Sequence, residues 1–199
     1  MTANAHQEKP STKWCHLTDG ASGGDQDPSH IKRAFRNGLG AFPTGVCVMT
    51  TAVDNELLGM TMSSFNSLSL DPPLVLFSIT KNAKSHGSWV RAGKVLIHVL
   101  EERQTDLSNR FARSLGDKWD GIDFSLTDDG LPLLEGAVAV YDCTAYAAHD
   151  GGDHTLFLVL VQRFQHVPSR RPLLFASGAY GKLADERGPA ADWPLHLGW

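Results

Sequence analysis

Extended segments rich in β-branched and apolar residues recur along the chain between short turn sequences, and this pattern limits the fold more than any other feature. Around the turn dipeptide Asp54-Asn55, two such segments are close enough to form a β-hairpin. Another follows Pro72-Pro73, where a strand can begin because its first residues tolerate proline. The expected strands are residues 46–53, 57–62, 74–80, 95–100, 137–148, 154–167 and 172–176.

Few helical segments interrupt these strands. A helix capped by Ser29 is expected over residues 31–37 and ended by Gly38 and Gly40, and two further short helices are expected over residues 84–91 and 105–112. Because strands and helices do not alternate strictly, the pattern predicts a mainly β fold, an antiparallel barrel with short peripheral helices.

The length and composition fit one domain with trailing ends. The chain has 199 residues, of which 42% are hydrophobic and 20% charged, as is ordinary for a globular protein. Residues 1–28 are polar and rich in glycine, serine, aspartate and glutamine, so we expect a mobile N-terminal arm. Residues 29–183 are expected to form the domain and residues 184–199 a C-terminal tail. Because residues 193–199 are apolar, we expect the tail to dock on the barrel or on a partner subunit.

Charge and cysteine content exclude several classes of protein. A formal net charge of −4 argues against nucleic acid or an anionic membrane as the main partner. The apolar runs are far shorter than the ~20 residues of a membrane span, and no secretory signal is visible, so a cytoplasmic protein is expected. Cys15, Cys47 and Cys143 form no C-x-x-C pair, so neither a disulfide framework nor a zinc site is indicated. Cys47 and Cys143 are expected in the core.

Four sequence blocks occur in a recognisable order. They are Phe42-Pro43-Thr44-Gly45-Val46, residues 59–75, Gly151-Gly152-Asp153-His154-Thr155 and residues 173–183. Together these blocks resemble the flavin reductase family, which has the FMN-binding split-barrel fold. The resemblance covers residues 30–183. It implies a homodimer that uses NADH or NADPH to reduce FMN or FAD, and a separate flavin-dependent monooxygenase that receives the reduced flavin.

The resemblance also implies a flavin-binding set. Beside the ring it places Pro43, Thr44, Gly45, Val46, Thr61, Met62, Ser63 and Ser64, and near the ribityl chain and phosphate Ser67, Leu68 and Ser69. Lys81, Lys84 and Ser85 follow the next strand and would supply cations and a hydroxyl to the phosphate. An extended backbone offers N–H and C=O groups to the ring edge, and Gly45 permits a close approach.

His154 has three interpretations. In the family it faces the nicotinamide, together with Gly152, Asp153 and Tyr180. It is otherwise a half-buried strand histidine, or part of a metal site with the nearby carboxylates and His149. We assign no metal, because no second cluster of ligands with matching spacing is visible. We also assign no catalytic acid or base, because hydride transfer mainly requires the two rings to stack in register.

Two further functions remain possible from the sequence. One is a flavoprotein that keeps its flavin for electron relay or sensing, and the other is a module that binds another planar ligand without redox chemistry. The glycines and His154 favour the reductase, because a flavin carrier needs no nicotinamide pocket. The sequence leaves FMN and FAD undistinguished, and the lack of a basic cluster near His154 favours NADH over NADPH.

Overall fold

The computed structural model describes residue 17 and residues 28–114 and 116–184. The chain divides into two compact units between Phe42 and Pro43, and each is described by itself. The first contains helix α1 (Pro28–Gly40), which begins earlier and ends later than expected. The expected cap, Ser29, therefore lies inside the first turn, where a preceding proline is well tolerated. The expected mobile arm and docked tail fall almost entirely outside the described residues.

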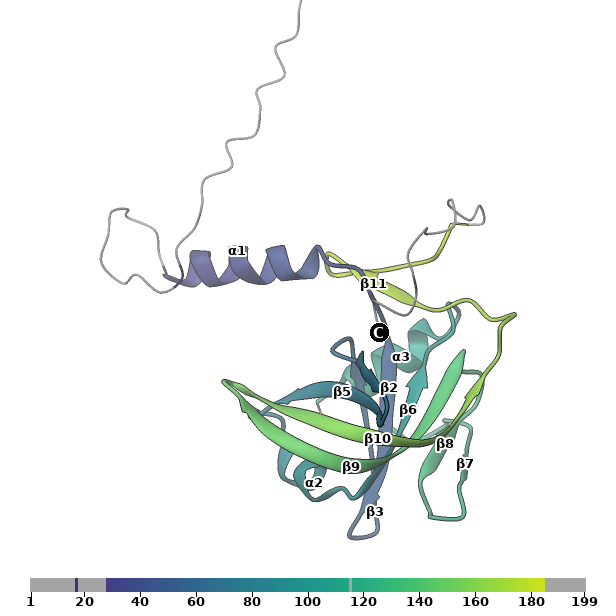
Figure 1. Cartoon of the computed structure of the whole chain (residues 1–199). Coiled ribbons are helices and arrows are strands. Elements are labelled where there is room, and N and C mark those ends of the chain that lie inside the picture. The colour runs from purple at the N-terminus through teal and green to yellow at the C-terminus, as the bar shows by residue number, and fades with distance from the viewer. Residues whose placement is uncertain (1–16, 18–27, 115, 185–199) are drawn as a thin grey trace, which may run out of the picture. The chain divides into compact units, whose positions relative to one another are not determined.

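The second unit is built from antiparallel sheets (Figure 1). Its seven-stranded sheet has the order β3-β2-β6-β9-β10-β5-β4. These strands are β2 (Cys47–Val53), β3 (Glu56–Met62), β4 (Asn66–Leu70), β5 (Pro73–Thr80), β6 (Lys94–Val99), β9 (Ala139–Gly151) and β10 (His154–His166). The smaller sheets contain β1 (Thr44–Gly45), β11 (Leu174–Ala176) and β12 (Ala179–Gly181), and β7 (Phe124–Leu126) with β8 (Pro132–Leu134). The helices of this unit are α2 (His86–Arg91) and α3 (Thr105–Ala112), so the prediction of a mainly β, antiparallel fold is confirmed.

A very short link joins the two edge strands of the large sheet. A flat sheet of this size would hold its edges roughly 29 Å apart at a strand spacing of ~4.8 Å. The four Cα–Cα steps from Met62, which ends β3, to Asn66, which begins β4, reach at most ~15 Å. The sheet must therefore curl. In the link itself, the Phe65 ring stacks on Tyr141 of the central strand β9, with ring centroids 5.8 Å apart.

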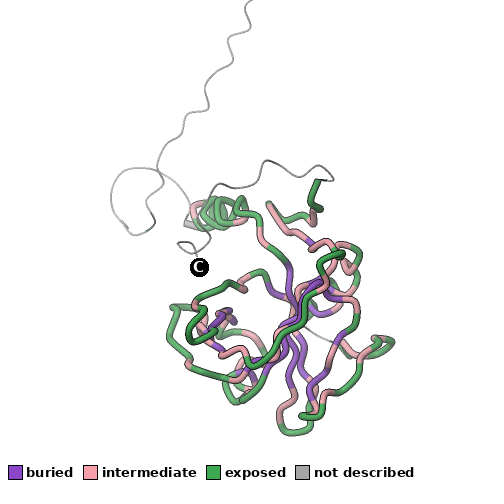
Figure 2. Tube along the Cα trace, turned by 45° about the vertical axis from the view of Figure 1, so that its right-hand side comes forward, coloured by how far each residue is buried: buried purple, intermediate pink, exposed green. Residues whose placement is uncertain are grey.

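The main core lies on the inner face of this curled sheet, and Figure 2 shows the buried stretches concentrated in its strands. Phe77 of β5 and Phe157 of β10 are paired across the strands and stack with ring centroids 5.2 Å apart. Cys47 and Cys143 belong to the same core, as expected. Burial raises the pKa of each thiol to about 12, so both behave as small apolar residues.

Several expected elements need correction. Strand β4 was not expected, although Asn66-Ser67-Leu68-Ser69-Leu70 alternates polar and apolar residues before a turn; it pairs with β5 and contains a bulge between Ser67 and Ser69. The hairpin β7–β8 was also missed, because no strand was expected between residues 112 and 137. Strand β9 extends to Gly151, because its partner β10 continues the pairing to the end of the hairpin. None of the described helices is long and apolar enough to cross a membrane.

A buried histidine joins three strands. His98 of β6 is fully buried; its Nδ1–H donates to the carbonyl of Val48 in β2 at 3.0 Å. Its Nε2 accepts a hydrogen bond from the backbone N–H of Leu134 in β8 at 3.1 Å. Because Nε2 serves as an acceptor, the ring must be neutral. Burial lowers the pKa of His98 to about 4 from its usual 6.5.

A second core cluster lies under α3 and depends on a glycine. Gly59 of β3 faces the ring of Phe111, which is fully buried. A Cβ at Gly59 would lie 2.3 Å from Cε1 of Phe111 and 3.2 Å from Cζ2 of Trp119. The rings of Phe111, Trp119 and Phe124 pack edge-to-face in sequence, with centroids 4.9 Å apart in both pairs.

We predict that acid destabilises the fold through His98. Unfolded histidine takes up a proton below about pH 6.5, whereas folded His98 does so only near pH 4. The contribution of neutral His98 to the free energy of unfolding is therefore complete above pH 6.5 and is lost as the pH falls. The loss between pH 7 and pH 4.5 is roughly 2–3 kcal/mol. Urea unfolding of the wild type and of His98→Gln measures this, and the variant should have a shallower pH dependence. An equal slope in both proteins would contradict it, and His149→Ala, at an exposed histidine, serves as control.

We also predict that Gly59→Ala destabilises the protein by about 1–3 kcal/mol, because the added methyl group overpacks the Phe111 ring. Gly93→Ala is the matched control, since a Cβ there meets no atom within 4 Å. The control should change the free energy of unfolding by less than about 0.5 kcal/mol. Chemical denaturation measures both, and equal stabilities of the two variants would refute the close contact.

Candidate functional site

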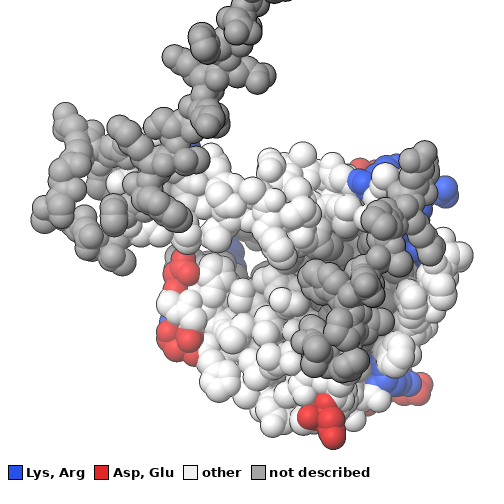
Figure 3. All heavy atoms as spheres, turned by 45° about the horizontal axis from the view of Figure 1, so that its top comes forward, with Lys and Arg blue, Asp and Glu red and all other residues white. Residues whose placement is uncertain are grey.

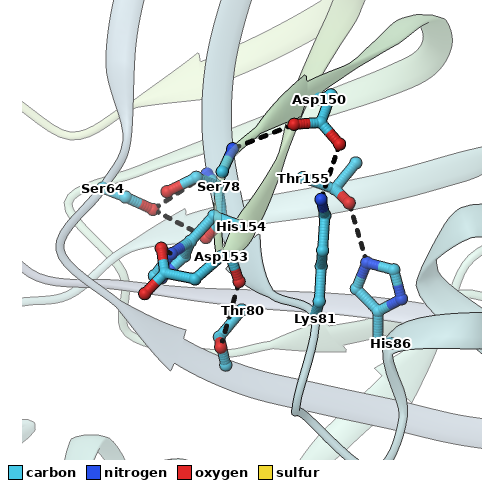
Figure 4. Close-up of polar contacts among 10 residues, drawn as sticks. Ser64, Ser78, Thr80, Lys81, His86, Asp150, Asp153, His154 and Thr155 are labelled. Atoms are coloured by element: carbon cyan, nitrogen blue, oxygen red, sulfur yellow. Dashed lines mark hydrogen bonds and ion pairs between the residues drawn. The ribbon is translucent and has the colours of Figure 1, made fainter.

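The tip of the β9–β10 hairpin is held against the end of β5. Its two-residue turn contains Gly152, at a φ of 75° that suits glycine. The carboxylate of Asp150 accepts the Gly152 N–H at 3.0 Å. The backbone N–H of Lys81, just after β5, donates to the carbonyl of Asp153 at 2.9 Å. The turn is thus fixed from both sides, as Figure 4 shows in part.

His154 stands at the first position of β10, beside this turn. Its Nδ1 donates to the Asp153 carboxylate at 2.7 Å, and this contact lowers the pKa of Asp153. The imidazole is 43% exposed. Within the described part of the chain, no protein group engages Nε2. The neutral ring therefore offers Nε2 to a ligand as an acceptor, and its protonated form would offer it as a donor.

Lys81 has a partner that the sequence did not reveal. Its ammonium lies 2.6 Å from Oδ2 of Asp150, which is distant in sequence and comes from the hairpin (Figure 4). The hydrogen bond from Lys81 lowers the pKa of Asp150. A carboxylate thus already compensates the charge of Lys81, which leaves this lysine less available to a phosphate than the sequence suggested.

A second contact ties the hairpin to helix α2. Nε2 of His86 lies 2.8 Å from Oγ1 of Thr155, the residue after His154 (Figure 4). His86 follows Lys84 and Ser85 directly in the chain. The segment expected to bind phosphate and the histidine expected to face the nicotinamide are thus connected through one side-chain hydrogen bond.

The residues expected beside the flavin ring differ in which of their groups a ligand can reach. Val46 and Met62 point into the core, so only their backbone groups are available. Pro43 and Ser63 are exposed and Thr44 is half-buried. A Cβ added to Gly45 would meet nothing within 4 Å, so the space beside this backbone is open.

Thr61 and Ser64, both expected beside the flavin ring, already make side-chain hydrogen bonds inside the protein. Oγ1 of Thr61 donates to the carbonyl of Ser108 in α3 at 2.7 Å. Oγ of Ser64 donates to the carbonyl of Ser78 at 3.1 Å and accepts its N–H at 3.0 Å. Ser64 therefore satisfies β5 where pairing with β4 has ended, and Figure 4 shows this contact.

The other expected phosphate residues separate into two groups. Ser67, Leu68 and Ser69 lie on the edge strand β4. Lys84 and Ser85 instead line a cavity of about 920 Å³, a size typical of small-molecule sites. Its other walls were missed because they come from distant segments; they are residues 55–60, residues 111–114 and residues 116–119.

Tyr180 lies in a different cluster from His154. Its ring packs against Phe175, and its hydroxyl donates to Oδ1 of Asn109 at 2.9 Å. The Ser108 hydroxyl, 2.9 Å away, therefore donates to the Tyr180 oxygen. These contacts attach β12 to α3, and the structure does not group Tyr180 with the hairpin residues. The sequence carries no signal for this, because the partners are far apart along the chain.

Charge and metal-ligand content are both modest. On the face drawn in Figure 3, lysine and arginine side chains form small scattered groups beside acidic ones rather than one basic surface. Among residues 17, 28–114 and 116–184, no group of three or more His, Cys, Asp or Glu side chains is placed to hold a metal ion.

Comparison with known proteins gives a consistent result. Residues 39–184 match the model of the flavin reductase like domain. The chain is 44% identical over 152 residues to the NADH-dependent FMN reductase SmoA of Agrobacterium fabrum, covering 76% of this chain and 86% of that protein. It is 42% identical over 163 residues to HsaB of Mycobacterium tuberculosis, the reductase subunit of a flavin-dependent monooxygenase, covering 81% and 87% of the two proteins.

Similar solved structures agree with these sequence comparisons. Nitrilotriacetate monooxygenase component B from Mycobacterium thermoresistibile has a TM-score of 0.80 at 39% identity, over 86% of this chain and 97% of that one. The NADH:FAD oxidoreductase SgcE6 of Streptomyces globisporus, solved with NAD and FAD fragments, has a TM-score of 0.75 at 38% identity, over 83% and 98% of the two chains. The family prediction is confirmed: the chain belongs to the flavin reductase family.

Proposed function

We propose that this protein transfers a hydride from NADH to FMN or FAD and that the reduced flavin leaves to serve a separate monooxygenase. The observation that supports this most directly is the similarity, over most of both chains, to reductases whose names specify NADH and a flavin. Relatives named as reductase subunits of flavin-dependent monooxygenases support the separate partner.

The proposal includes a split barrel and a homodimer. The curled sheet supports the barrel, because the three-residue link between β3 and β4 brings its edges together at one corner. Within that link, the side chain of Ser64 rather than a neighbouring strand satisfies the backbone of Ser78 in β5, as expected where a barrel is split. The homodimer and a cytoplasmic location stay predictions from the sequence and the family resemblance.

The site residues fit a bound flavin nucleotide. The open space at Gly45 and the exposed Pro43 and Ser63 suit an approach of the ring to the backbone. Lys84 and Ser85 supply a cation and a hydroxyl to the cavity, as a phosphate requires. When bound, the flavin supplies the hydride acceptor, and the backbone N–H groups nearby would stabilise the negative charge that develops on it.

On the nicotinamide side, we assign His154, Asp153 and Gly152. Asp153 holds the imidazole by Nδ1, so Nε2 keeps a fixed direction toward a ligand. The turn is anchored by Asp150 and Lys81, which limits the movement of His154 and favours alignment of the two rings. Tyr180 acts differently in this proposal: its hydroxyl positions α3 and, through Ser108, the strand that carries Thr61.

The reaction itself gives the first test. With catalytic amounts of protein, NADH absorbance should fall at a rate that rises with added FMN or FAD, because the flavin is a substrate. One stoichiometric reduction of a tightly held flavin, without further turnover, would instead support the electron-relay alternative. NADPH in place of NADH tests the preference for the unphosphorylated nucleotide.

We predict that His154→Ala raises the KM for NADH about tenfold, with a smaller change in kcat, because one hydrogen bond to the nicotinamide nucleotide is lost. The affinity for FMN should change less than twofold. His149→Ala is the matched control, an exposed histidine of the same hairpin, paired with Leu156. Steady-state kinetics with varied NADH measures both variants, and unchanged constants in His154→Ala would exclude the assignment.

A further inference from the structure

One lysine in the wall of the large cavity, Lys118, has no role in the function proposed above. Lys118 is half-buried in the cavity wall, in the loop that follows α3. Its ammonium donates to the carbonyls of Gly59 at 3.0 Å and Phe111 at 3.2 Å. Among the described residues it makes no ion pair. Two neutral carbonyls do not compensate a full positive charge, and burial accordingly lowers the pKa of Lys118.

The loop that carries this lysine is held in a defined conformation. The Asp117 carboxylate accepts the N–H groups of Trp119 and Asp120 at 2.9 and 3.2 Å. The Arg110 guanidinium donates to the carbonyls of Asp117 and Asp120 at 3.4 and 3.1 Å. Lys118 lies between these anchor points, so its ammonium is directed by the surrounding structure.

The same cavity contains the groups that a phosphate requires. Lys84, Ser85 and Ser88 line it together with Lys118. An ammonium has three N–H donors, and the carbonyls use only two of those on Lys118. An anionic ligand would accept the third and supply the missing charge. A hydrogen bond of this kind, between two charged groups, is among the stronger ones in proteins.

We propose that Lys118 binds a phosphate ester of the nucleotide that occupies this cavity, as a second cation beside Lys84. The inference rests on the proposed function and adds a binding residue to it. Both nucleotides of the reaction carry phosphate. The flavin phosphate is the source that the proposed role of Lys84 and Ser85 favours, and the diphosphate of NADH is the other source.

The test compares ligands that differ only in the phosphate. Dissociation constants of riboflavin and FMN are measured for the wild type, Lys118→Gln, Lys118→Met and Lys118→Arg. Loss of the charge should weaken FMN binding by about ten- to a hundredfold and leave riboflavin binding within about twofold. Lys118→Arg should keep most of the preference for FMN. Lys94→Gln is the control, because Lys94 already has an ion pair with Asp129 at 2.7 Å outside the cavity.

A second measurement identifies the source of the phosphate. With riboflavin as the hydride acceptor, the KM for NADH should be unchanged in Lys118→Gln if the site binds the flavin phosphate. A raised KM for NADH with an unchanged FMN affinity would support the site and assign it to the dinucleotide. Lys118→Met keeps the apolar stem of the side chain, so it provides a folded variant if the glutamine variant does not fold.

Two results would overturn the inference. Equal weakening of riboflavin and FMN would mean that Lys118 only supports the fold, and unchanged binding of FMN and NADH would mean that it binds no phosphate. Failure of the proposed function gives a different result, since the wild type would then neither bind flavin nor oxidise NADH.

Discussion

The short link between the edge strands of the large sheet determines where its large cavity lies. Because residues 63–65 connect β3 with β4, the sheet has to curl, and β3 is brought toward β5 although four strands separate them in the sheet order. The cavity of about 920 Å³ is lined by residues 55–60 on one side and by residues 80 and 82–85 on the other. It therefore occupies the region between strands that approach each other without forming a ladder.

Ser64 shows how the protein tolerates this gap. A strand edge without a partner leaves backbone N–H and C=O groups unsatisfied. The Ser64 hydroxyl satisfies both groups of Ser78, so one side chain replaces a missing strand residue. A hydroxyl in a sequence block that resembles a flavin site can thus already be hydrogen-bonded within the protein. Its presence in the block alone does not make it a ligand contact.

Local patterns in the sequence predicted most of the strands and the helix from Thr105 to Ala112. The family motifs predicted the family. The contacts that shape the site could not be predicted from one sequence, since they join distant residues: Lys81 with Asp150, His86 with Thr155, and Tyr180 with Asn109. Periodicity reports which face of an element is buried, and it carries no information on partners across such separations. Strand β4 is different, because its alternation was visible and its serines were interpreted only as ligand contacts.

Gly59 has a consequence for how such proteins are recognised. It stands at the start of the long block that resembles flavin reductases, yet the absence of a side chain there is required by the ring of Phe111. Gly59 is therefore required for packing, and it also lies in the wall of the large cavity. A chain that had lost the ability to bind flavin would still keep the glycine for as long as Phe111 packed against it. Part of the motif therefore reports how the domain packs, and an assignment of activity needs residues whose side chains are not already required by the core.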